Sequence, residues 1–274
     1  MESTRSEVAL AEARARLGDL AWGLLDDGDR PGAENMALDH ALAATLPEGT
    51  AVLRLYGWAR PTVSFGRHEP ARERYRPLPD TDHVRRPTGG RAVLHRADLT
   101  YAVVFPAATG LRAAYRLVHA ALGAGLARLG LDVTLAADRD VASPRSPGAC
   151  FARPAGGELT TGGRKVLGSA QARIGRTILQ HGSLLLVDDQ SALAAAALGP
   201  VPAVEATTLE RVLGRAPDPA SLRRALVEGV QETLGVRLRP AEGAAAFEAA
   251  RSLRARYASA AWTWDGVDGL ARTL

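Results

Sequence analysis

The chain has 274 residues, 46% of them hydrophobic and 23% charged, with a formal net charge of +4. These values are typical of a globular protein that buries a full core without staples. A single cysteine excludes a disulfide framework within the chain and a multi-cysteine zinc site. No apolar stretch reaches the ~18 residues of a membrane-spanning helix, and the first residues lack the apolar core of a signal peptide. We therefore expect a cytoplasmic protein with no metal and no membrane partner.

The predicted elements begin with a short amphipathic arm over residues 1–19, followed later by a helix from Pro31 to about Leu46. Most of the remaining first half alternates apolar runs with turns, which is typical of strands. The expected strands are 22–29, 51–58, 62–66, 84–95 and 99–105. The Arg60-Pro61 step favours a hairpin between the second and the third of these strands.

The second half opens on the clearest helix, 109–130, whose leucines recur at helical spacing before a stop at Gly130. A Pro/Gly-rich loop over 143–163 comes between the sheet-forming runs, which are 132–135, 165–168, 171–174 and 177–187. The helices expected after them are 190–198, 206–213, 219–234 and 241–257. Adjacent strands with helices before and after predict an α+β fold with mixed, mostly antiparallel sheets and surrounding helices. We expect one catalytic domain over 20–274, with a helical C-terminal third from about residue 190.

The basic residues are almost all arginine. Of the 34 basic residues, 33 are arginine, and the one lysine is Lys165. Arginine stays protonated, whereas a lysine can lose its proton when its surroundings lower its pKa. Lys165 is therefore a candidate for proton transfer, and the alternative is an incidental surface lysine. The small excess of cations is spread along the chain, so we expect no nucleic-acid partner.

Three strings of residues point to a ligand site. The first, RRPTGGRAVLH at 85–95, places Gly89 and Gly90 where the backbone can approach a ligand closely, beside arginines that offer forked donors. The alternative is a hairpin turn with solvated arginines. The second string, 162–171, starts a strand with Lys165 and Leu167 on one face, which would aim the lysine into a pocket. The third, 178–186, contains His181, which could line the same cavity or be a structural histidine.

The cysteine, Cys150, lies in the Pro/Gly-rich loop, 15 residues before Lys165. A lone cysteine is most often a small buried apolar residue. A thiol has an ordinary pKa of about 8.5, so a nearby amine could take its proton or stabilise the thiolate. The chain thus holds one candidate nucleophile and one titratable amine, close in sequence.

Together the strings resemble the lipoate-protein ligase and octanoyltransferase superfamily. RRPTGGRAVLH is similar to its first motif, GRKVLGSAQAR to its lysine-bearing motif and ILQHGSLLL to the segment that follows. The resemblance covers roughly residues 22–187. It implies the mixed α+β fold of biotin and lipoate ligases, and an apolar tunnel for an octanoyl chain with the lysine near the carbonyl. The tunnel is expected to end at Gly89, Gly90 and Lys165, with candidate wall residues Val93, Leu94, Val166 and Leu167.

Within the superfamily the chain is most similar to LipM-type octanoyltransferases, which carry a cysteine before the lysine motif in a context like that of Cys150. LipB-type transferases have the cysteine after the lysine. ATP-dependent ligases typically carry a third glycine where this chain has Arg91. A lipoyl or octanoyl amidotransferase, an ATP-dependent ligase and a non-catalytic acyl-binding module stay open as alternatives.

The resemblance implies that Cys150 takes the octanoyl group from octanoyl-[acyl carrier protein], with Lys165 as general acid and base. A lysine of a lipoyl domain, such as that of the glycine cleavage H protein, would then receive the group. No cofactor is expected, and ATP with Mg²⁺ would be needed only by a ligase. The expected substrate-binding residues are Arg85, Arg86, Thr88, Gly89, Gly90, Arg91, Ala92, His95, Gly168, Ser169, Ala170, His181 and Gly182.

Overall fold

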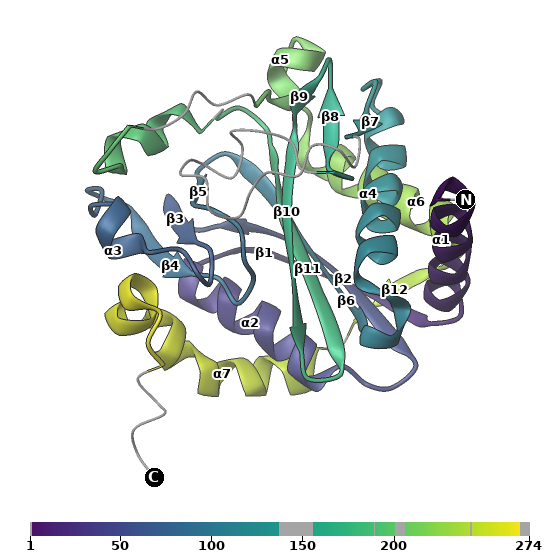
Figure 1. Cartoon of the computed structure of the whole chain (residues 1–274), viewed down its shortest axis with the longest axis horizontal. Coiled ribbons are helices and arrows are strands. Elements are labelled where there is room, and N and C mark those ends of the chain that lie inside the picture. Colours follow the sequence, from purple (N-terminus) through teal and green to yellow (C-terminus); the bar gives the residue numbers. More distant parts are fainter. Residues whose placement is uncertain (1, 137–155, 189, 201–205, 242, 269–274) are drawn as a thin grey trace.

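The computed structural model describes residues 2–136, 156–188, 190–200, 206–241 and 243–268 (Figure 1). Its centre is a six-stranded sheet with the strand order β10-β11-β6-β2-β1-β12. The strands are β1 (Ala21–Arg30), β2 (Thr50–Trp58), β6 (Asp98–Pro106), β10 (Leu167–Ile174), β11 (Thr177–Leu185) and β12 (Leu238–Pro240). The pairs from β10 to β2 are antiparallel, while β1 pairs with β2 and with β12 in parallel.

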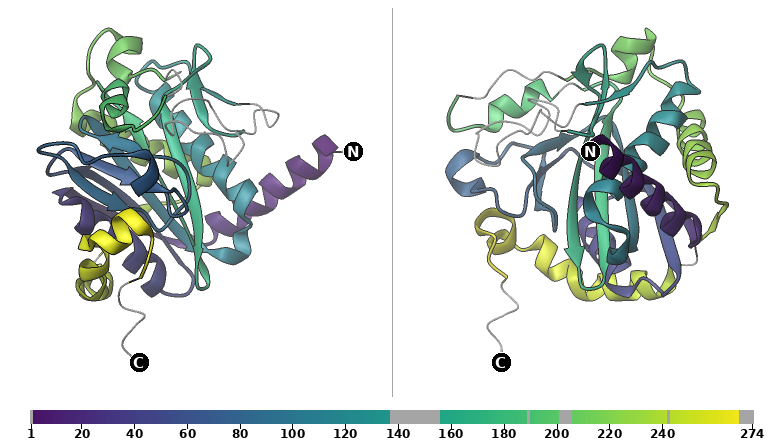
Figure 2. Two further views of the ribbon diagram at one scale, coloured as in Figure 1. Left: turned by 60° about the vertical axis from the view of Figure 1, so that its left-hand side comes forward. Right: turned by 45° about the vertical axis from the view of Figure 1, so that its right-hand side comes forward.

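Helices cover both faces of this sheet. α2 (Gly32–Thr45) and α7 (Ala244–Ala258) lie on one face, and α1 (Glu2–Gly18), α4 (Leu111–Ala127) and α6 (Pro219–Leu234) lie on the other (Figures 1 and 2). Alternate residues of a strand point to opposite faces, so each strand supplies both layers. In β6, Tyr101 and Val103 pack towards α4 and α6, while Ala102 and Val104 pack towards α2.

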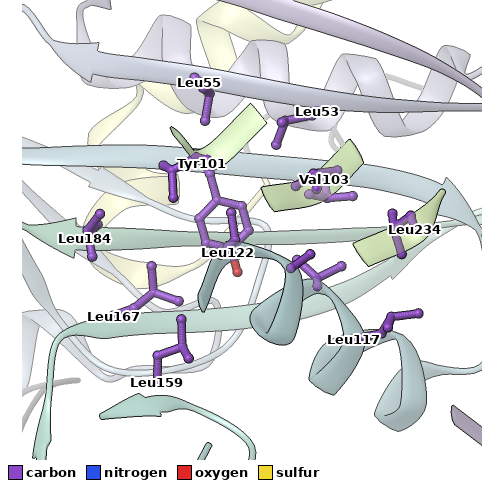
Figure 3. Packing of buried hydrophobic residues seen from close by; sticks show 14 of the residues in the cluster. Leu53, Leu55, Tyr101, Val103, Leu117, Leu122, Leu159, Leu167, Leu184 and Leu234 are labelled. Atoms are coloured by element: carbon purple, nitrogen blue, oxygen red, sulfur yellow. The ribbon is translucent and has the colours of Figure 1, made fainter. Parts of the chain in front are cut away.

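Figure 3 shows the larger of these two layers from close by. Leu53 of β2 and Val103 of β6 meet the helix side chains Leu117, Leu122 and Leu234. The N-terminal helix joins the same layer through Ala13 and Leu17, which are buried. The division into an arm and a single catalytic domain stays a prediction.

Two small sheets carry the motifs. One has the order β4-β3-β5 and the other β7-β8-β9. Their strands are β3 (Thr62–Phe65), β4 (Asp82–Arg85), β5 (Val93–His95), β7 (Thr134–Leu135), β8 (Leu159–Thr161) and β9 (Arg164–Lys165). The expected hairpin between 51–58 and 62–66 is wrong, because β1 and β6 occupy both edges of β2 and leave none for β3. The Gly89-Gly90 turn likewise does not join paired strands, since β3 lies between β4 and β5.

The last third is helical, as predicted, apart from the three-residue edge strand β12. α6 has strong boundaries: Asp218 accepts a hydrogen bond from Ser221 N at its start, and Gly235 ends it at a φ of 71°. These are the capping groups that helix ends require. The remaining elements are short: α3 (Ala71–Arg74), α5 (Leu209–Leu213), 3-10 helices at Ala107–Thr109 and Ser191–Ala196, and a π-helical turn at Ala261–Asp265. Within the described ranges, no helix combines the length and the apolar character needed to cross a membrane.

Candidate active site

A cavity lies where the β4-β3-β5 sheet meets strands β2, β6, β10 and β11. It holds about 330 Å³ of space between atoms, counting the open solvent at its mouth. Seven of the predicted substrate-binding residues line it: Arg86, His95, Gly168, Ser169, Ala170, His181 and Gly182. The others on its wall are Met36, Tyr56, Trp58, Ser64, Val93, Thr100 and Ser183.

The strand register brings the second and third motifs together. Ser169 pairs with Gly182, and Ala170 pairs with His181, across the antiparallel β10 and β11. A Cβ atom on Gly182 would lie 2.2 Å from Ser169 Oγ and 2.4 Å from the carbonyl oxygen of Gly168. Residue 182 must therefore be glycine, because a side chain there would collide with the backbone of β10 and with the Ser169 side chain.

Arg86 organises the loop of the first motif. Its Nη1 donates to the carbonyl oxygen and to Oγ of Ser64, both at 2.7 Å. Its Nη2 donates to the carbonyl oxygens of Gly89 at 3.0 Å and Arg91 at 2.9 Å. A Cβ on Gly66 would lie 1.9 Å from the carbonyl oxygen of Gly90. The close approach expected at Gly89 and Gly90 is therefore made by the protein's own backbone at Gly66.

Six of the predicted binding residues of the first motif do not line the cavity: Arg85, Thr88, Gly89, Gly90, Arg91 and Ala92. Arg85 donates at 2.8 Å to the carbonyl oxygens of Trp262 and Gly66, and burial lowers the pKa of its guanidinium. Thr88 places Oγ1 2.6 Å from His181 Nε2. Ala92 is buried in the small core beneath β3. A substrate-binding role for these residues stays a prediction.

Two histidines on the wall have matching surroundings. His95 places Nδ1 2.8 Å from Asp98 Oδ2 and Nε2 2.7 Å from Ser64 Oγ. His181 places Nδ1 2.8 Å from Asp39 Oδ2, and its Nε2 faces the Thr88 hydroxyl. A carboxylate on Nδ1 and a hydroxyl on Nε2 fix the tautomer, with the proton on Nδ1.

The charge states on this wall follow from burial and from the neighbours. Burial lowers the pKa of His95, so its ring is neutral near pH 7. Burial raises the pKa of Asp39, but Arg54, whose Nη1 lies 2.6 Å from Asp39 Oδ1, acts together with His181 and Tyr56 to hold that pKa below its usual value. Both nitrogens of each imidazole already have hydrogen-bond partners in the protein, so an apolar chain can contact the rings without leaving a polar atom unsatisfied. Sequence reasoning missed Asp39 and Asp98, because only the tertiary structure brings them to the histidines.

Lys165 is buried, with 1% of its surface exposed, so the alternative of an incidental surface lysine is wrong. Its Nζ lies 2.7 Å from Glu158 Oε2, and β9 pairs it with Thr160 of β8. It does not line the cavity, although Gly168, three residues later, does. Cys150 falls in 137–155, outside the described residues, so the predicted distance between its sulfur and Lys165 is not described.

The expected tunnel is present only in part. Of the four candidate wall residues, Val93 lines the cavity. Leu94 packs in the core of the small sheet, and Val166 and Leu167 pack in the main core. These three side chains face the hydrophobic clusters of the fold, and a role for them in the tunnel wall stays a prediction.

Comparison with known proteins places the chain in a family. Residues 31–231 match the lipoyl protein ligase A/B catalytic domain. The octanoyltransferase LipM of Symbiobacterium thermophilum is 39% identical over 250 residues, covering 81% of this chain and 89% of that protein. This chain belongs to the lipoyl protein ligase A/B family. The octanoyltransferase LipM of Bacillus subtilis is 34% identical over 254 residues, which cover 81% of this chain and 89% of that protein. The resemblance inferred from the motifs is confirmed.

Solved structures confirm the predicted fold class. A lipoate-protein ligase A bound with ATP matches with a TM-score of 0.74 and 23% identity, over 91% of this chain and 100% of that one. A putative lipoate protein ligase from T. acidophilum with bound lipoic acid matches with a TM-score of 0.71 and 24% identity, over 90% and 99%. At these identities, the comparison establishes only that this chain shares the fold of both proteins.

Proposed function

We propose that this protein is an octanoyltransferase of lipoate biosynthesis that transfers the octanoyl group to a lysine of a lipoyl domain. The observation that carries the proposal is the 34–39% identity to LipM octanoyltransferases across 89% of their length. The motif residues gathered around one cavity support it, because residues far apart in the chain converge there.

The first half-reaction loads the enzyme. The thiolate of Cys150 attacks the carbonyl carbon of octanoyl-[acyl carrier protein], and the carbon–sulfur bond to the carrier breaks. The departing carrier thiolate takes a proton from the Lys165 ammonium. The products are an octanoyl-cysteine, a carrier thiol and a neutral Lys165. Such covalent catalysis replaces one difficult step with two easier ones.

The second half-reaction unloads it. The neutral amine of the acceptor lysine attacks the octanoyl-cysteine, Lys165 takes a proton from the attacking nitrogen, and the Cys150 thiolate departs. The products are an octanoyl amide and the starting thiolate–ammonium pair, so the protons balance over the cycle. Conversion of a thioester to an amide is downhill, and ATP is not needed. We take the glycine cleavage H protein as the acceptor.

In this proposal the acyl tail binds against the cavity wall. Met36, Trp58 and Val93 supply apolar contacts, and the two satisfied histidines add ring surface. Burial of the methylenes at ~0.8 kcal/mol each stabilises the bound octanoyl group by about 5 kcal/mol. This binding energy orients the carbonyl towards the reacting groups.

Mass spectrometry after incubation with octanoyl-[acyl carrier protein] alone tests the proposal. We expect one octanoyl adduct on Cys150, which is lost when an H protein is added and reappears on a lysine of that protein. A requirement for ATP with free lipoate would identify a ligase. Loading only from octanoylated H protein would identify an amidotransferase, and binding without an adduct would identify a non-catalytic module.

A further inference from the structure

Glu158, which no motif includes, forms a buried ion pair with Lys165. The 2.7 Å contact joins side chains that are 2% and 3% exposed. An isolated charge in such surroundings is strongly disfavoured, whereas a paired and hydrogen-bonded charge is tolerated. The carboxylate at contact distance therefore favours the ammonium form of Lys165.

The position of Glu158 is held from two sides. Its carbonyl oxygen accepts a hydrogen bond from Ala136 N at 2.8 Å. The carbonyl oxygen of Gly157, one residue earlier, accepts from His119 Nδ1 at 2.6 Å. The hydroxyl of Tyr115 lies 3.4 Å from Glu158 Oε1. Helix α4 and the β7 end thus fix the carboxylate against Lys165.

The same helix connects the ion pair to the cavity. Because His119 donates from Nδ1, its Nε2 is an acceptor, and Ser169 Oγ on the cavity wall donates to it at 2.8 Å. The hydroxyl of Tyr115 also lies 3.3 Å from the carbonyl oxygen of Ser169. A change at Glu158 therefore acts on a segment that is tied to the substrate site.

The described titratable and charged groups around the pair come from α4, β9 and β6, where the buried Tyr101 interacts electrostatically with Glu158. Tyr115, Arg116 and His119 project from α4, and Arg164 precedes Lys165 on β9 but is exposed. Burial lowers the pKa of His119 to about 4, so this histidine carries no charge near pH 7. Glu158 supplies a carboxylate in direct contact with the ammonium.

We propose that Glu158 is a positioning residue, which fixes Lys165 and keeps it as the ammonium that donates a proton to the departing carrier thiolate. The inference rests on the proposed function, since it deepens the role of Lys165. The proton moves from Lys165 Nζ to the carrier sulfur as the carbon–sulfur bond breaks, and a proton of the acceptor amine restores it. Glu158 stays ionised and transfers no proton.

The test is single-turnover octanoylation of Cys150, measured from about pH 6 to about pH 9.5 in wild type and in Glu158→Gln. Without the carboxylate, burial favours the neutral amine, so Lys165 loses its proton below the ordinary lysine value of about 10.4. We expect the ratio of variant to wild-type rate to fall about tenfold per pH unit across the alkaline part of this range. Glu228→Gln is the matched control. It removes the same charge from an exposed pair, in which Glu228 Oε2 lies 2.8 Å from Arg128 Nε, and its ratio should stay near one at every pH.

A ratio that is reduced but constant with pH shows a merely structural role and overturns the inference, while the proposed function stands. If Glu158→Gln does not fold, Glu158→Asp decides, because its shorter carboxylate should give a smaller fall in the same direction. A flat ratio for that variant also overturns the inference. Absence of an octanoyl adduct in wild type overturns the proposed function, and this inference with it.

Discussion

Neighbouring arginines in the first motif differ because successive residues of a strand face opposite sides. Arg85, at the end of β4, turns towards main-chain carbonyl groups that include that of Trp262. Arg86 turns towards the cavity and closes the motif loop onto Ser64. The planar guanidinium serves both positions, since it reaches several acceptors at once. Side-chain direction at single residues thus separates a structural cation from one at the site.

The role of Cys150 is tested by Cys150→Ala. We expect octanoyl transfer to be abolished, because the alanine cannot form a thioester. Transfer is measured by mass spectrometry of the acceptor, and circular dichroism checks the fold. Retention of full activity would exclude the acyl-enzyme mechanism.

The second change at this scale is Lys165→Arg. It keeps the positive charge, but a guanidinium does not give up a proton at working pH. We expect turnover to fall at least ~100-fold, which is the usual scale for removing a general acid or base. Acylation and transfer should be timed separately across pH, with octanoyl binding as the control. Near-wild-type rates in both steps would show that any cation suffices.

At the scale of elements, the site depends on close contact between β10 and β11. Ser169 crosses over Gly182, and the same serine donates to His119 of α4. One strand pair therefore joins the cavity wall to the helix that holds Glu158. An added side-chain atom at this contact has no free space to occupy, because protein interiors are close-packed.

Gly182→Ala is expected to push the two strands apart. The added methyl group would lie 2.4 Å from a backbone oxygen, which cannot turn away as a side chain does. Overpacking of this kind costs about 1–3 kcal/mol of unfolding free energy, and octanoyl transfer should fall with it. Urea denaturation gives the first quantity. Gly199→Ala, where an added Cβ meets no atom within 4 Å, should leave both unchanged.

At the scale of the whole molecule, buried neutral histidines couple stability to pH. His119 is fully buried and its pKa in the folded state is about 4, below the ordinary value of 6.5. Between these two values the unfolded chain binds more protons than the folded chain, so stability decreases as pH falls. His95, whose pKa is also lowered by burial, acts in the same direction.

We therefore expect the unfolding free energy to decrease between pH 7 and pH 4, with about 3 kcal/mol of the loss due to His119. Urea denaturation at several pH values measures the loss. His119→Gln should be less stable at pH 7, because it loses hydrogen bonds, but its stability should depend less on pH by that amount. An unchanged pH dependence in the variant would contradict the assignment.

The sequence alone was enough for the fold class, most element positions and the three motifs. Apolar runs bounded by turns predicted strands such as β2 and β6, and Gly130 marked the end of the helix observed as α4, because these signals depend on near neighbours in the chain. Residues 85–95, 162–171 and 178–186 identified the family and eight residues of the cavity wall, seven of them expected to bind substrate and one, Val93, expected in the tunnel wall.

Only the tertiary structure decided which strands pair and which side chains meet. The predicted hairpin of β2 and β3 failed, since pairing depends on which strand edges are free in the assembled sheet. The partners of His95 and His181 also required the fold, because Ser64 lies 31 residues from His95 and Asp39 lies 142 residues from His181. Glu158 stands seven residues before Lys165, but the β8-β9 pairing and burial make it the counter-ion. Such contacts form only when separate segments of the chain pack together, so patterns among neighbouring residues do not encode them.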